Sequence, residues 1–464
     1  MNALREINFK DKQVLLRVDY NVPIDDSISR PHAISTPTIR DTHRIDTTLP
    51  TIRHIINEGA SVIYLISHRG RPGGKYVPEL DLSPVHNYLK TLDGLKHVEF
   101  IQGKWSWNHE RTKTKTDDQT ISTPNPTGTR IILFDNIRFH PEEEAETITD
   151  EVRNFRRYLT SLCDVYVNDA FACCHREHSS IVGIDAPVKC YGDIIGKELY
   201  YLQSIFEAEY PEKRRKGNWS GRSKIITAIV GGSKVSDKIK LLERMIPKIN
   251  HLLIGGGMAF TFMKYMGYTI GDSLFDKEGY ELVPRIIENA RRHGVVLSLP
   301  LDFICNTTFS NSGDIIETGM NIPNGYMGLD IGPRTIEAFQ RTIDMTNCVI
   351  WNGPLGVFEM ESFSHGTRRL MEYIGEWSWT WKVLNVSRNR NRRGQGQGQG
   401  QGRDDGTPHN DKMSIIGGGD TAACCLQFGC REKMSWISTG GGASLTLIEG
   451  GTLPGLTFLE KESE

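Results

Sequence analysis

Five cationic side chains in the first half of the chain follow short apolar runs, either directly or within a short distance. They are Arg44, His68, Arg71, Arg138 and Arg176. A guanidinium group presents a planar fork of N–H donors that matches the oxygens of carboxylate and phosphate. Any one of these arginines would ordinarily be a solvated surface residue. The whole set at successive strand ends instead indicates a site for a small ligand that carries phosphate and carboxylate groups.

Glycine-rich stretches in the second half of the chain have the composition of phosphate-binding loops. Gly triplets occur at 255–257, 417–419 and 440–442, and a paired-glycine motif, GGSKVSDK, occupies 231–238. Loops without Cβ atoms let a nucleotide approach the backbone closely, and N–H groups at a helix start favour an anion. Asp420 offers the carboxylate oxygens that Mg²⁺ prefers.

The two lysines of the paired-glycine motif, Lys234 and Lys238, are four residues apart. A helix that begins at this motif would place both on one face. A Walker-type P-loop is excluded, because no Gly-Lys pair in the sequence is followed by Ser or Thr. The spacing of Gly417, Gly419 and Ala422 matches the dinucleotide fingerprint, but the acidic residue expected about 20 positions later is missing.

Three further polar groups have competing interpretations. Glu359 follows a Gly-Pro turn at 353–354, and it either accepts hydrogen bonds from ribose hydroxyls or is a solvated residue after an ordinary tight turn. The cluster CCHREH at 173–178 lacks the spacing of a structural zinc site. We expect Asp169 to be a loop or cap residue rather than a catalytic carboxylate.

Short runs rich in Val and Ile, without polar alternation, must position these groups. Such runs are typical of strands buried on both faces. They occur at 14–18, 61–66, 130–134, 164–167, 225–230, 251–254, 294–299, 348–351, 413–416 and 434–437. Helix-like segments lie between several of them, at 47–58, 235–249 and 278–293. The alternation predicts an α/β fold with parallel sheets, whose ligands bind beyond the carboxyl ends of the strands.

The length of 464 residues and the ten expected strands indicate two sheets in two domains. A helix expected at 195–210, followed by the polar stretch 211–223, is the expected connection. Two polar segments, 104–128 and 385–412, are expected to be surface loops, and the second is expected to be disordered. The basic run 388–393 inside the second segment would be a solvated loop or, alternatively, a contact for nucleic acid or a partner.

Composition narrows the class of protein further. The net charge of −2 gives no sign of a broad surface for nucleic acid or membranes. The apolar runs are far shorter than the roughly 20 residues that a membrane span needs. The first residues, MNALREINFKDK, lack an apolar signal core. Nine cysteines without a C-x-x-C pair fit reduced thiols and a cytoplasmic location.

Taken together, the ordered motifs resemble those of the phosphoglycerate kinase family over nearly the whole chain. The motifs are RVDYNVP (17–23), SHRGRP (67–72), NIRFHPEEE (136–144), YVNDAF (166–171), GGSKVSDKIKL (231–241), LLIGGGMAFTF (252–262), MGLDIGP (327–333), WNGPLGVFE (351–359), GGGDTAA (417–423) and STGGGASL (438–445).

This resemblance implies two doubly wound parallel-sheet domains joined by a hinge helix, with the active site in the cleft between them. The first domain, 1–203, would bind 3-phosphoglycerate or 1,3-bisphosphoglycerate, and 450–464 would fold back onto it. The second domain, 204–449, would bind ADP or ATP with Mg²⁺, and the insert 385–412 would belong to it. The implied activity is reversible phosphoryl transfer from 1,3-bisphosphoglycerate to ADP.

The resemblance also assigns residues to each ligand. The substrate-binding set is Asp19, Tyr20, Asn21, Arg44, His68, Arg69, Gly70, Arg71, Arg138 and Arg176. The nucleotide set is Lys234, Lys238, Gly328, Asn352, Glu359, Gly418, Gly419, Asp420 and Thr421, with Asp420 also as the metal ligand. The catalytic set is Arg44, Lys234, Gly418 and Gly441. Only small-molecule partners are implied, with no nucleic acid and no membrane, for a cytoplasmic monomer.

The chain departs from the family pattern at a few positions. The family usually has Phe at Tyr20, Leu at Arg69, Ala at Ser233, Leu-Glu at 134–135 and Gly-Thr-Ala at 172–174. None of these changes removes a charged site residue, but Arg69 adds a cation beside the expected site. An alternative is a catalytically weak family member that acts as a binding or scaffold protein, with the insert as its partner surface.

Overall fold

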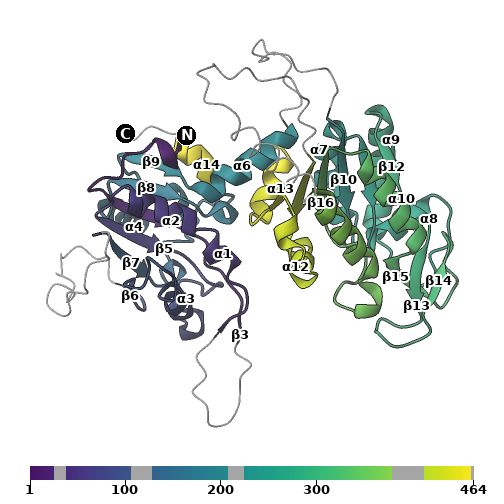
Figure 1. Cartoon of the computed structure of the whole chain (residues 1–464), viewed down its shortest axis with the longest axis horizontal. Helices are drawn as coiled ribbons and strands as arrows, with labels where there is room; N and C mark the ends of the chain where they lie inside the picture. Colours follow the sequence, from purple (N-terminus) through teal and green to yellow (C-terminus); the bar gives the residue numbers. More distant parts are fainter. Residues whose placement is uncertain (26–37, 106–127, 207–223, 379–411, 461–464) are drawn as a thin grey trace, which may run out of the picture. The chain divides into compact units, whose positions relative to one another are not determined.

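The structure is a computed structural model (Figure 1), and it describes residues 1–25, 38–105, 128–206, 224–378 and 412–460. The expectations for the loops at 106–127 and 385–411, and for the chain at 207–223, lie outside these residues. The chain divides into two compact units. Unit 1 comprises Met1–Tyr200 with Thr452–Glu464, and unit 2 comprises Tyr201–Gly451.

Unit 1 is built on a seven-stranded sheet in which every neighbouring pair is parallel. In spatial order its strands are β1 (Asn2–Ala3), β9 (Val188–Tyr191), β8 (Val165–Asn168), β2 (Gln13–Arg17), β5 (Val62–Ile66), β7 (Arg130–Phe134) and β6 (Glu99–Ile101). A separate two-stranded antiparallel sheet joins β3 (Ile24–Asp25) to β4 (Thr38–Ile39).

Both faces of the unit 1 sheet are buried, which explains the unbroken apolar runs. Val14 and Leu16 pack into one core with helices α2 (Leu49–Asn57) and α3 (Ser83–Leu89). Leu15, between them on β2, points to the opposite core with α4 (Asp150–Ser161). Consecutive strand residues point to opposite faces, so this sheet is doubly wound as expected.

The end of the chain belongs to unit 1. Helix α14 (Pro454–Glu460) packs against α5 (Ser179–Val182) and β9. The backbone N–H of Gly455 donates to the carbonyl of Cys174 at 2.9 Å, and Leu459 is buried in the core that contains Phe155. The returning segment therefore completes one face of the first sheet.

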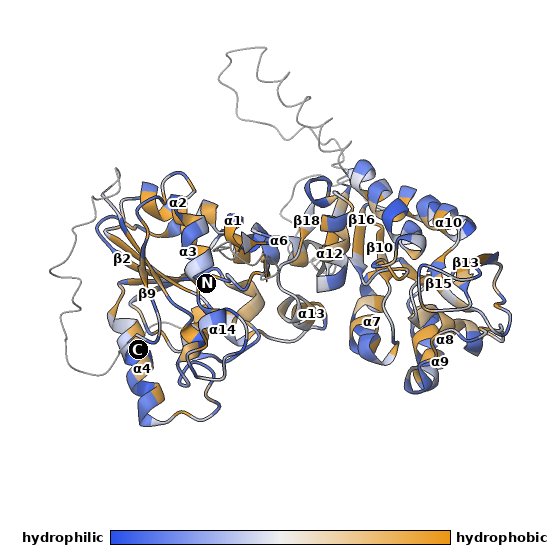
Figure 2. Cartoon of the chain, turned by 90° about the horizontal axis from the view of Figure 1, so that it is seen from below, coloured by the Kyte–Doolittle hydropathy of each residue, from blue (hydrophilic) through white to orange (hydrophobic). Residues whose placement is uncertain are grey.

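Unit 2 has a six-stranded sheet that is also wholly parallel. In spatial order its strands are β12 (Val296–Ser298), β11 (His251–Ile254), β10 (Ile226–Val230), β16 (Cys348–Asn352), β17 (Met413–Gly417) and β18 (Trp436–Ile437). The expected second parallel sheet is confirmed. Figure 2 shows the apolar residues concentrated along strands such as β10 and β16, while α10 (Pro333–Asp344) carries polar residues on its outer side.

A three-stranded antiparallel sheet in unit 2 was not expected. It has the order β14 (Ile316–Thr318), β13 (Phe303–Asn306), β15 (Met327–Ile331). Strands β13 and β15 are mostly buried and β14 is not, but all three contain polar residues or glycine and lack the continuous Val and Ile runs that marked the other strands. The sheet forms a small core of its own, with Phe260, Met263 and Phe303.

The helices expected at 47–58 and 278–293 are present as α2 and α9 (Lys277–Arg292), but most of the other helices were not predicted. Among the described residues, unit 2 contains α7 (Ile239–Met245), α8 (Met258–Tyr265), α9, α10, a helix over 365–378, α12 (Gly419–Gln427) and α13 (Gly442–Ile448). Helix α6 (Asp193–Phe206) starts in unit 1 and crosses into unit 2. No helix within the described ranges has the length and apolar character needed to cross a membrane.

The prediction of a single helix at 235–249 is wrong. The segment divides into a 3₁₀ turn at Ser236–Lys238, helix α7, and a second 3₁₀ turn at Ile246–Lys248. Pro247 lacks a backbone N–H and cannot continue the α-helical hydrogen bonds of α7. Lys234 consequently precedes the helix, and it does not share a helix face with Lys238.

Candidate functional site

Unit 1 brings its polar residues together beyond the carboxyl ends of four neighbouring strands. Asp19 and Asn21 follow β2, and His68 follows β5. Arg138 lies on a 3₁₀ turn, Ile137–Phe139, directly after β7, and Arg176 follows β8 after a similar turn. Arg44 comes from the short helix α1 (His43–Asp46). The carboxyl ends of parallel strands share one edge of a sheet, which is where ligands bind in this architecture.

Asp19 joins the groups from three of these segments. Arg44 Nη1 donates to Asp19 Oδ2 in an ion pair, and Asn21 N donates to Asp19 Oδ1 at 3.1 Å. His68 Nδ1 lies 3.9 Å from Asp19 Oδ1. The carboxylate therefore holds the cation of α1 beside the ends of β2 and β5.

Arg138 is tied to the same edge through Gly70. The side-chain oxygen of Asn21 accepts the N–H of Gly70 at 3.0 Å, and the Gly70 carbonyl accepts Arg138 Nη1 at 2.8 Å. Arg138 Nε also lies 3.0 Å from Glu144 Oε1. Gly70 has φ +61°, and a Cβ there would lie 2.8 Å from Leu80, so this connection favours glycine.

The guanidinium donors of Arg71 and Arg176 are available to a ligand. Arg71 is exposed and Arg176 is half-buried. Neither side chain makes a hydrogen bond or ion pair with any other described residue. Open guanidinium groups beside a partly neutralised cluster give this edge of unit 1 a net attraction for anions.

Tyr20 and Arg69, which also belong to the expected substrate set, point elsewhere. The Tyr20 side chain is fully buried, and its hydroxyl lies 3.1 Å from Thr48 Oγ1. Arg69 is buried too, and its Nη1 donates to the carbonyl of Asp81 at 3.1 Å. The added cation of Arg69 is thus directed toward the turn before α3.

The sequence expectations missed Arg17, which lies fully buried beneath the site. Its Nε donates to Ser180 Oγ at 2.9 Å, and its Nη2 lies 3.3 Å from His68 Nδ1. Arginine has no acceptor, so His68 Nδ1 must accept this bond. The available signal was a charged residue directly after the apolar run 14–16, at the last position of the strand.

His68 is consequently a neutral donor. Burial lowers the pKa of His68 well below its ordinary value of 6.5, and the cations Arg17, Arg138 and Arg44 act in the same direction. With Nδ1 accepting from Arg17, the proton of the neutral ring lies on Nε2. This nitrogen can donate to an anionic ligand at neutral pH.

Asp169 is a cap residue, as expected. It is buried, and its Oδ1 accepts the N–H of Ile194 at 2.8 Å in the first turn of α6. Its Oδ2 accepts the hydroxyl of Thr51 at 2.6 Å. The carboxyl group therefore links α2 to the start of α6.

In unit 2 the loops that follow neighbouring strands interlock through their backbones. Gly231 N donates to the Asn352 carbonyl at 2.9 Å, and Gly232 N donates to the Pro354 carbonyl at 3.0 Å. A Cβ at Gly231 would lie only 2.0 Å from the Pro354 carbonyl oxygen. The loops after β10 and β16 can approach this closely only because the residue is glycine.

The Asn352 side chain lies where three of the expected nucleotide segments meet. Its Oδ1 accepts Lys238 Nζ, and a Cβ on Gly418 would lie 3.2 Å from its Nδ2. Thr421 Oγ1 accepts the N–H of Gly353, the next residue, at 2.7 Å. Burial lowers the pKa of Lys238, although the carboxylate of Asp420 acts to raise it.

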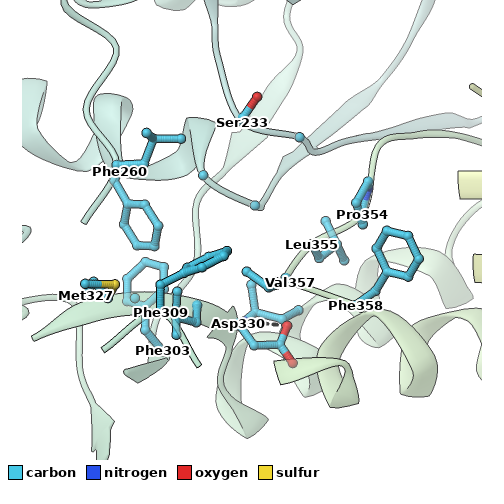
Figure 3. A pocket seen from close by; sticks show the side chains of 18 of the residues that line it. Ser233, Phe260, Phe303, Phe309, Met327, Asp330, Pro354, Leu355, Val357 and Phe358 are labelled. Carbon is cyan, nitrogen blue, oxygen red and sulfur yellow. Dashed lines mark hydrogen bonds between the residues drawn. The ribbon is translucent and has the colours of Figure 1, made fainter. Parts of the chain in front are cut away.

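A cavity of about 550 Å³ opens beside these loops (Figure 3). Its walls are mostly apolar, from Phe260, Phe303, Phe309, Met327 and Leu355. Polar side chains in its lining include Ser233, Glu359 and Asp420. An apolar cavity with a few polar groups is the usual form of a small-molecule site.

Of the remaining expected residues, some line this cavity and others follow neighbouring strands of the same sheet. Gly328 lines it, and a Cβ there would lie 2.5 Å from the Phe260 ring. Lys234 is exposed in the loop before Ser236. Gly418, with φ +88°, and Gly419 precede and begin α12, while Gly441, with φ +47°, precedes α13. Glu359 belongs to the lining as well.

The residues around Asp420 fit a magnesium ion carried by a nucleotide. Its carboxylate is exposed on the first turn of α12 and lines the cavity. The described parts of the chain contain no group of three or more side chains that could hold a metal. Mg²⁺ commonly takes one or two carboxylates and completes its shell with phosphate oxygens and water.

Comparison with known proteins agrees with this arrangement. The family model described as phosphoglycerate kinase matches residues 4–385 and 406–451. The phosphoglycerate kinase of Emericella nidulans is 38% identical over 479 residues, which cover 100% of this chain and 98% of that protein. That of Dictyostelium discoideum is 38% identical, with 98% of this chain and 97% of that protein covered.

Solved structures give the same result. The phosphoglycerate kinase of Coxiella burnetii has a TM-score of 0.73 and 30% identity, and the match covers 99% of this chain and 98% of that one. The enzyme from Pyrococcus horikoshii has a TM-score of 0.70 and 27% identity, with the same coverage. On the family match over most of its length and these full-length relatives, the chain belongs to the phosphoglycerate kinase family of phosphotransferase enzymes.

Proposed function

We propose that this chain catalyses the reversible transfer of a phosphoryl group from 1,3-bisphosphoglycerate to ADP, which gives 3-phosphoglycerate and ATP. The proposal rests on one observation: this single chain of the family contains two different anion sites, one in each unit. Unit 1 has guanidinium groups with open donors, and unit 2 has an apolar cavity beside glycine loops. The first suits a phosphorylated acid and the second a nucleotide.

The acid substrate binds at the edge of unit 1. Arg71 and Arg176 supply guanidinium donors for its phosphate and carboxylate, as does Arg138. His68 donates through Nε2. Asp19 and Asn21, which are not cationic, bind the glycerate hydroxyl and the neighbouring polar atoms, and Gly70 keeps the loop in place.

The nucleotide binds in unit 2. Its base and ribose occupy the cavity, where Glu359 accepts hydrogen bonds from the ribose hydroxyls and Gly328 leaves room for the ring. Its phosphates lie at the glycine loops. The groups that face them are Lys234, Lys238, Asn352, Gly418, Gly419, Asp420 and Thr421.

The transfer breaks the bond between phosphorus and the carboxyl oxygen of the acyl phosphate, and it forms a bond from phosphorus to the terminal phosphate oxygen of ADP. The transition state spreads negative charge over three equatorial oxygens, so positioning and electrostatics account for most of catalysis. Arg44 and Lys234 neutralise that charge. The N–H groups at Gly418 and Gly441 add donors.

No general base is needed in either direction. The attacking oxygen is a phosphate oxygen in one direction and a carboxylate oxygen in the other, and both are ionised at neutral pH. A bound Mg²⁺, held by Asp420 and the nucleotide, supplies further positive charge at the phosphates.

The two ligands belong to different units, so the transfer requires the units to close around them. Closure excludes water, which would otherwise accept the phosphoryl group. The boundary between the units falls inside α6, and this helix is the proposed hinge. From the family membership, we extend the proposal to a cytoplasmic monomer.

A coupled assay of ATP formation tests this proposal. Purified protein is mixed with 1,3-bisphosphoglycerate, ADP and Mg²⁺, and ATP is detected by a linked enzyme. We expect steady turnover that stops when ADP is withheld. Tight binding of both ligands without turnover would contradict the proposal and favour a scaffold role.

A further inference from the structure

Asp330, a residue with no role in the proposal so far, lies buried in the wall of the nucleotide cavity. It is the fourth residue of β15 and is 2% exposed. Figure 3 shows its carboxyl group beside Val357. Both carboxyl oxygens are occupied. Oδ1 accepts the N–H of Ile331 at 2.9 Å, and Oδ2 accepts the N–H of Gly366 at 2.7 Å.

Three segments of unit 2 meet at this carboxyl group. Gly366 is in the first turn of the helix over 365–378, so Asp330 caps that helix from another element. The loop over 353–359 passes directly over the carboxyl group, because a Cβ at Gly356 would lie 2.2 Å from Asp330 Oδ1. The third segment is β15 itself.

Two hydrogen bonds hold this loop against the elements that Asp330 connects. Val357 N donates to the Leu329 carbonyl at 2.9 Å, and Leu355 N donates to the buried Thr367 Oγ1 at 3.0 Å. The loop is thereby fixed to β15 on one side and to the helix on the other.

The position of this loop determines the shape of the nucleotide site. Its residues from Pro354 to Glu359 form one wall of the cavity. Its carbonyl groups also accept from the glycine loops, with Gly232 N on the Pro354 carbonyl and Gly256 N on the Leu355 carbonyl at 3.1 Å. A displacement of the loop would move both the cavity wall and the phosphate-binding backbone.

We propose that Asp330 is a positioning residue for the nucleotide, which ties β15 to the helix over 365–378 and thereby fixes the loop over 353–359 that is bonded to both. This inference rests on the proposed function, because it assigns the cavity to ADP. The residue does not contact the reacting atoms. It acts through the loop, so its loss weakens nucleotide binding and leaves the acid site of unit 1 intact.

The burial of this group agrees with such a role. Burial raises the pKa of Asp330 to about 8, although the N–H donors of Gly366 and Ile331 act to lower it. A carboxyl group is costly in this setting unless its hydrogen bonds are kept. One of the bonds that offset the cost, from Gly366, ties β15 to the helix over 365–378, and these are the two elements to which the loop is bonded.

The test compares ADP binding by isothermal titration calorimetry in the wild type and in Asp330→Asn. An amide has one acceptor oxygen where the carboxyl has two, so one of the two backbone bonds is lost. We expect the dissociation constant for ADP to rise about tenfold. In steady-state assays, the KM for ADP should rise in proportion, while the KM for 3-phosphoglycerate changes by less than about twofold.

Asp302→Asn is a matched control. Asp302 is also a buried carboxyl group in unit 2 that caps a helix from outside, since it accepts the N–H groups of Arg334 and Thr335 at 2.8 Å at the start of α10. It is not part of the cavity lining. The control should therefore lose stability but bind ADP as the wild type does.

A second variant covers the case in which Asp330→Asn does not fold. Thr367→Val keeps the side-chain shape and removes the bond to Leu355, so it should weaken ADP binding about threefold. Folded variants that bind ADP within twofold of the wild type would overturn the inference, as would an equal loss in Asp302→Asn. A wild type that does not bind ADP would overturn the proposed function, and this inference with it.

Discussion

Asp19 and Arg44 show how single residues prepare the proposed acid site. Their ion pair holds a partly exposed guanidinium, with a side chain 35% exposed, next to His68 and Asn21. An exposed pair of this kind contributes little to stability. The role of the ion pair is to position Arg44, because it keeps this cation at the edge of the sheet before any ligand binds.

We expect Arg44→Ala to lower kcat by on the order of 10³, because a transition-state arginine contributes about this much in other phosphoryl-transfer enzymes. The measurement is steady-state turnover in the coupled assay, with circular dichroism to check folding. Arg53→Ala is the control, since Arg53 is an exposed arginine of α2 outside the site. A near-normal kcat in Arg44→Ala would rule out the role given to this residue.

At the scale of elements, Asp276 connects the glycine motif to α9. Its Oδ1 caps the helix by accepting Gly279 N at 3.0 Å, and its Oδ2 accepts Ser236 N at 2.9 Å in the loop that follows Lys234. One carboxylate therefore starts a helix and fixes the end of the proposed phosphate loop.

Asp276→Ala should destabilise the protein by about 1–2 kcal/mol, which is the usual cost of a lost N-cap. Burial acts to raise the pKa of Asp276, but the N–H donors of Ser236 and Gly279 hold it below the ordinary 3.8. The stabilisation is then present above the pKa of the unfolded chain and is lost as the pH falls through the folded value. Urea unfolding at several pH values should show the difference between wild type and variant shrinking below about pH 4. A difference that grew in acid would contradict this assignment.

Elements with a strong local signal could be predicted from the sequence. Runs such as 130–134 and 251–254 are strands with those bounds, because a strand buried on both faces needs unbroken apolar residues. The strands of the antiparallel sheet could not be predicted, since β14 is half-exposed and is specified by its neighbour β13. Helix α7 is shorter than expected, because a 3₁₀ turn precedes it and Pro247 ends its hydrogen bonding.

The candidate site also has parts that could be predicted from the sequence and parts that could not. Glycine loops and strand-end arginines are visible in the sequence, because their residue types are unusual for their positions. Arg17 and Asp330 are buried, and their importance comes from contacts with Ser180 and Gly366, which are distant in sequence. Such contacts depend on the tertiary fold, so spacing alone does not show them.

At the scale of the whole molecule, the chain ends in the unit where it begins. Leu459 of α14 is 3% exposed and packs into the core of unit 1 beside Tyr166 and Phe155. Gly455 is bonded to Cys174, two residues before Arg176. The last helix is therefore part of the structure that supports the proposed acid site.

Leu459→Ala should destabilise unit 1 by about 2–5 kcal/mol, because it leaves a cavity in a buried core. Hydrogen exchange resolved by peptide should become faster in β2 and β8 and stay unchanged in β10 and β16. Leu370→Ala is the matched control, since Leu370 is buried in the core of unit 2 with Trp351, and it should give the opposite pattern. Faster exchange in both units from Leu459→Ala would show that α14 does not belong to unit 1 alone.

The central claim is that one unit binds the acid and the other binds the nucleotide, with the transferred group between Arg44 and Lys234. A crystal structure with 3-phosphoglycerate and ADP bound together would test it most directly. We expect the acid at hydrogen-bond distance, about 3 Å, from Arg71, Arg138 and Arg176, and ADP in the cavity lined by Phe260 and Glu359. Both ligands in the same unit, or bound ligands whose reacting ends lie far from Arg44 and Lys234, would contradict the account.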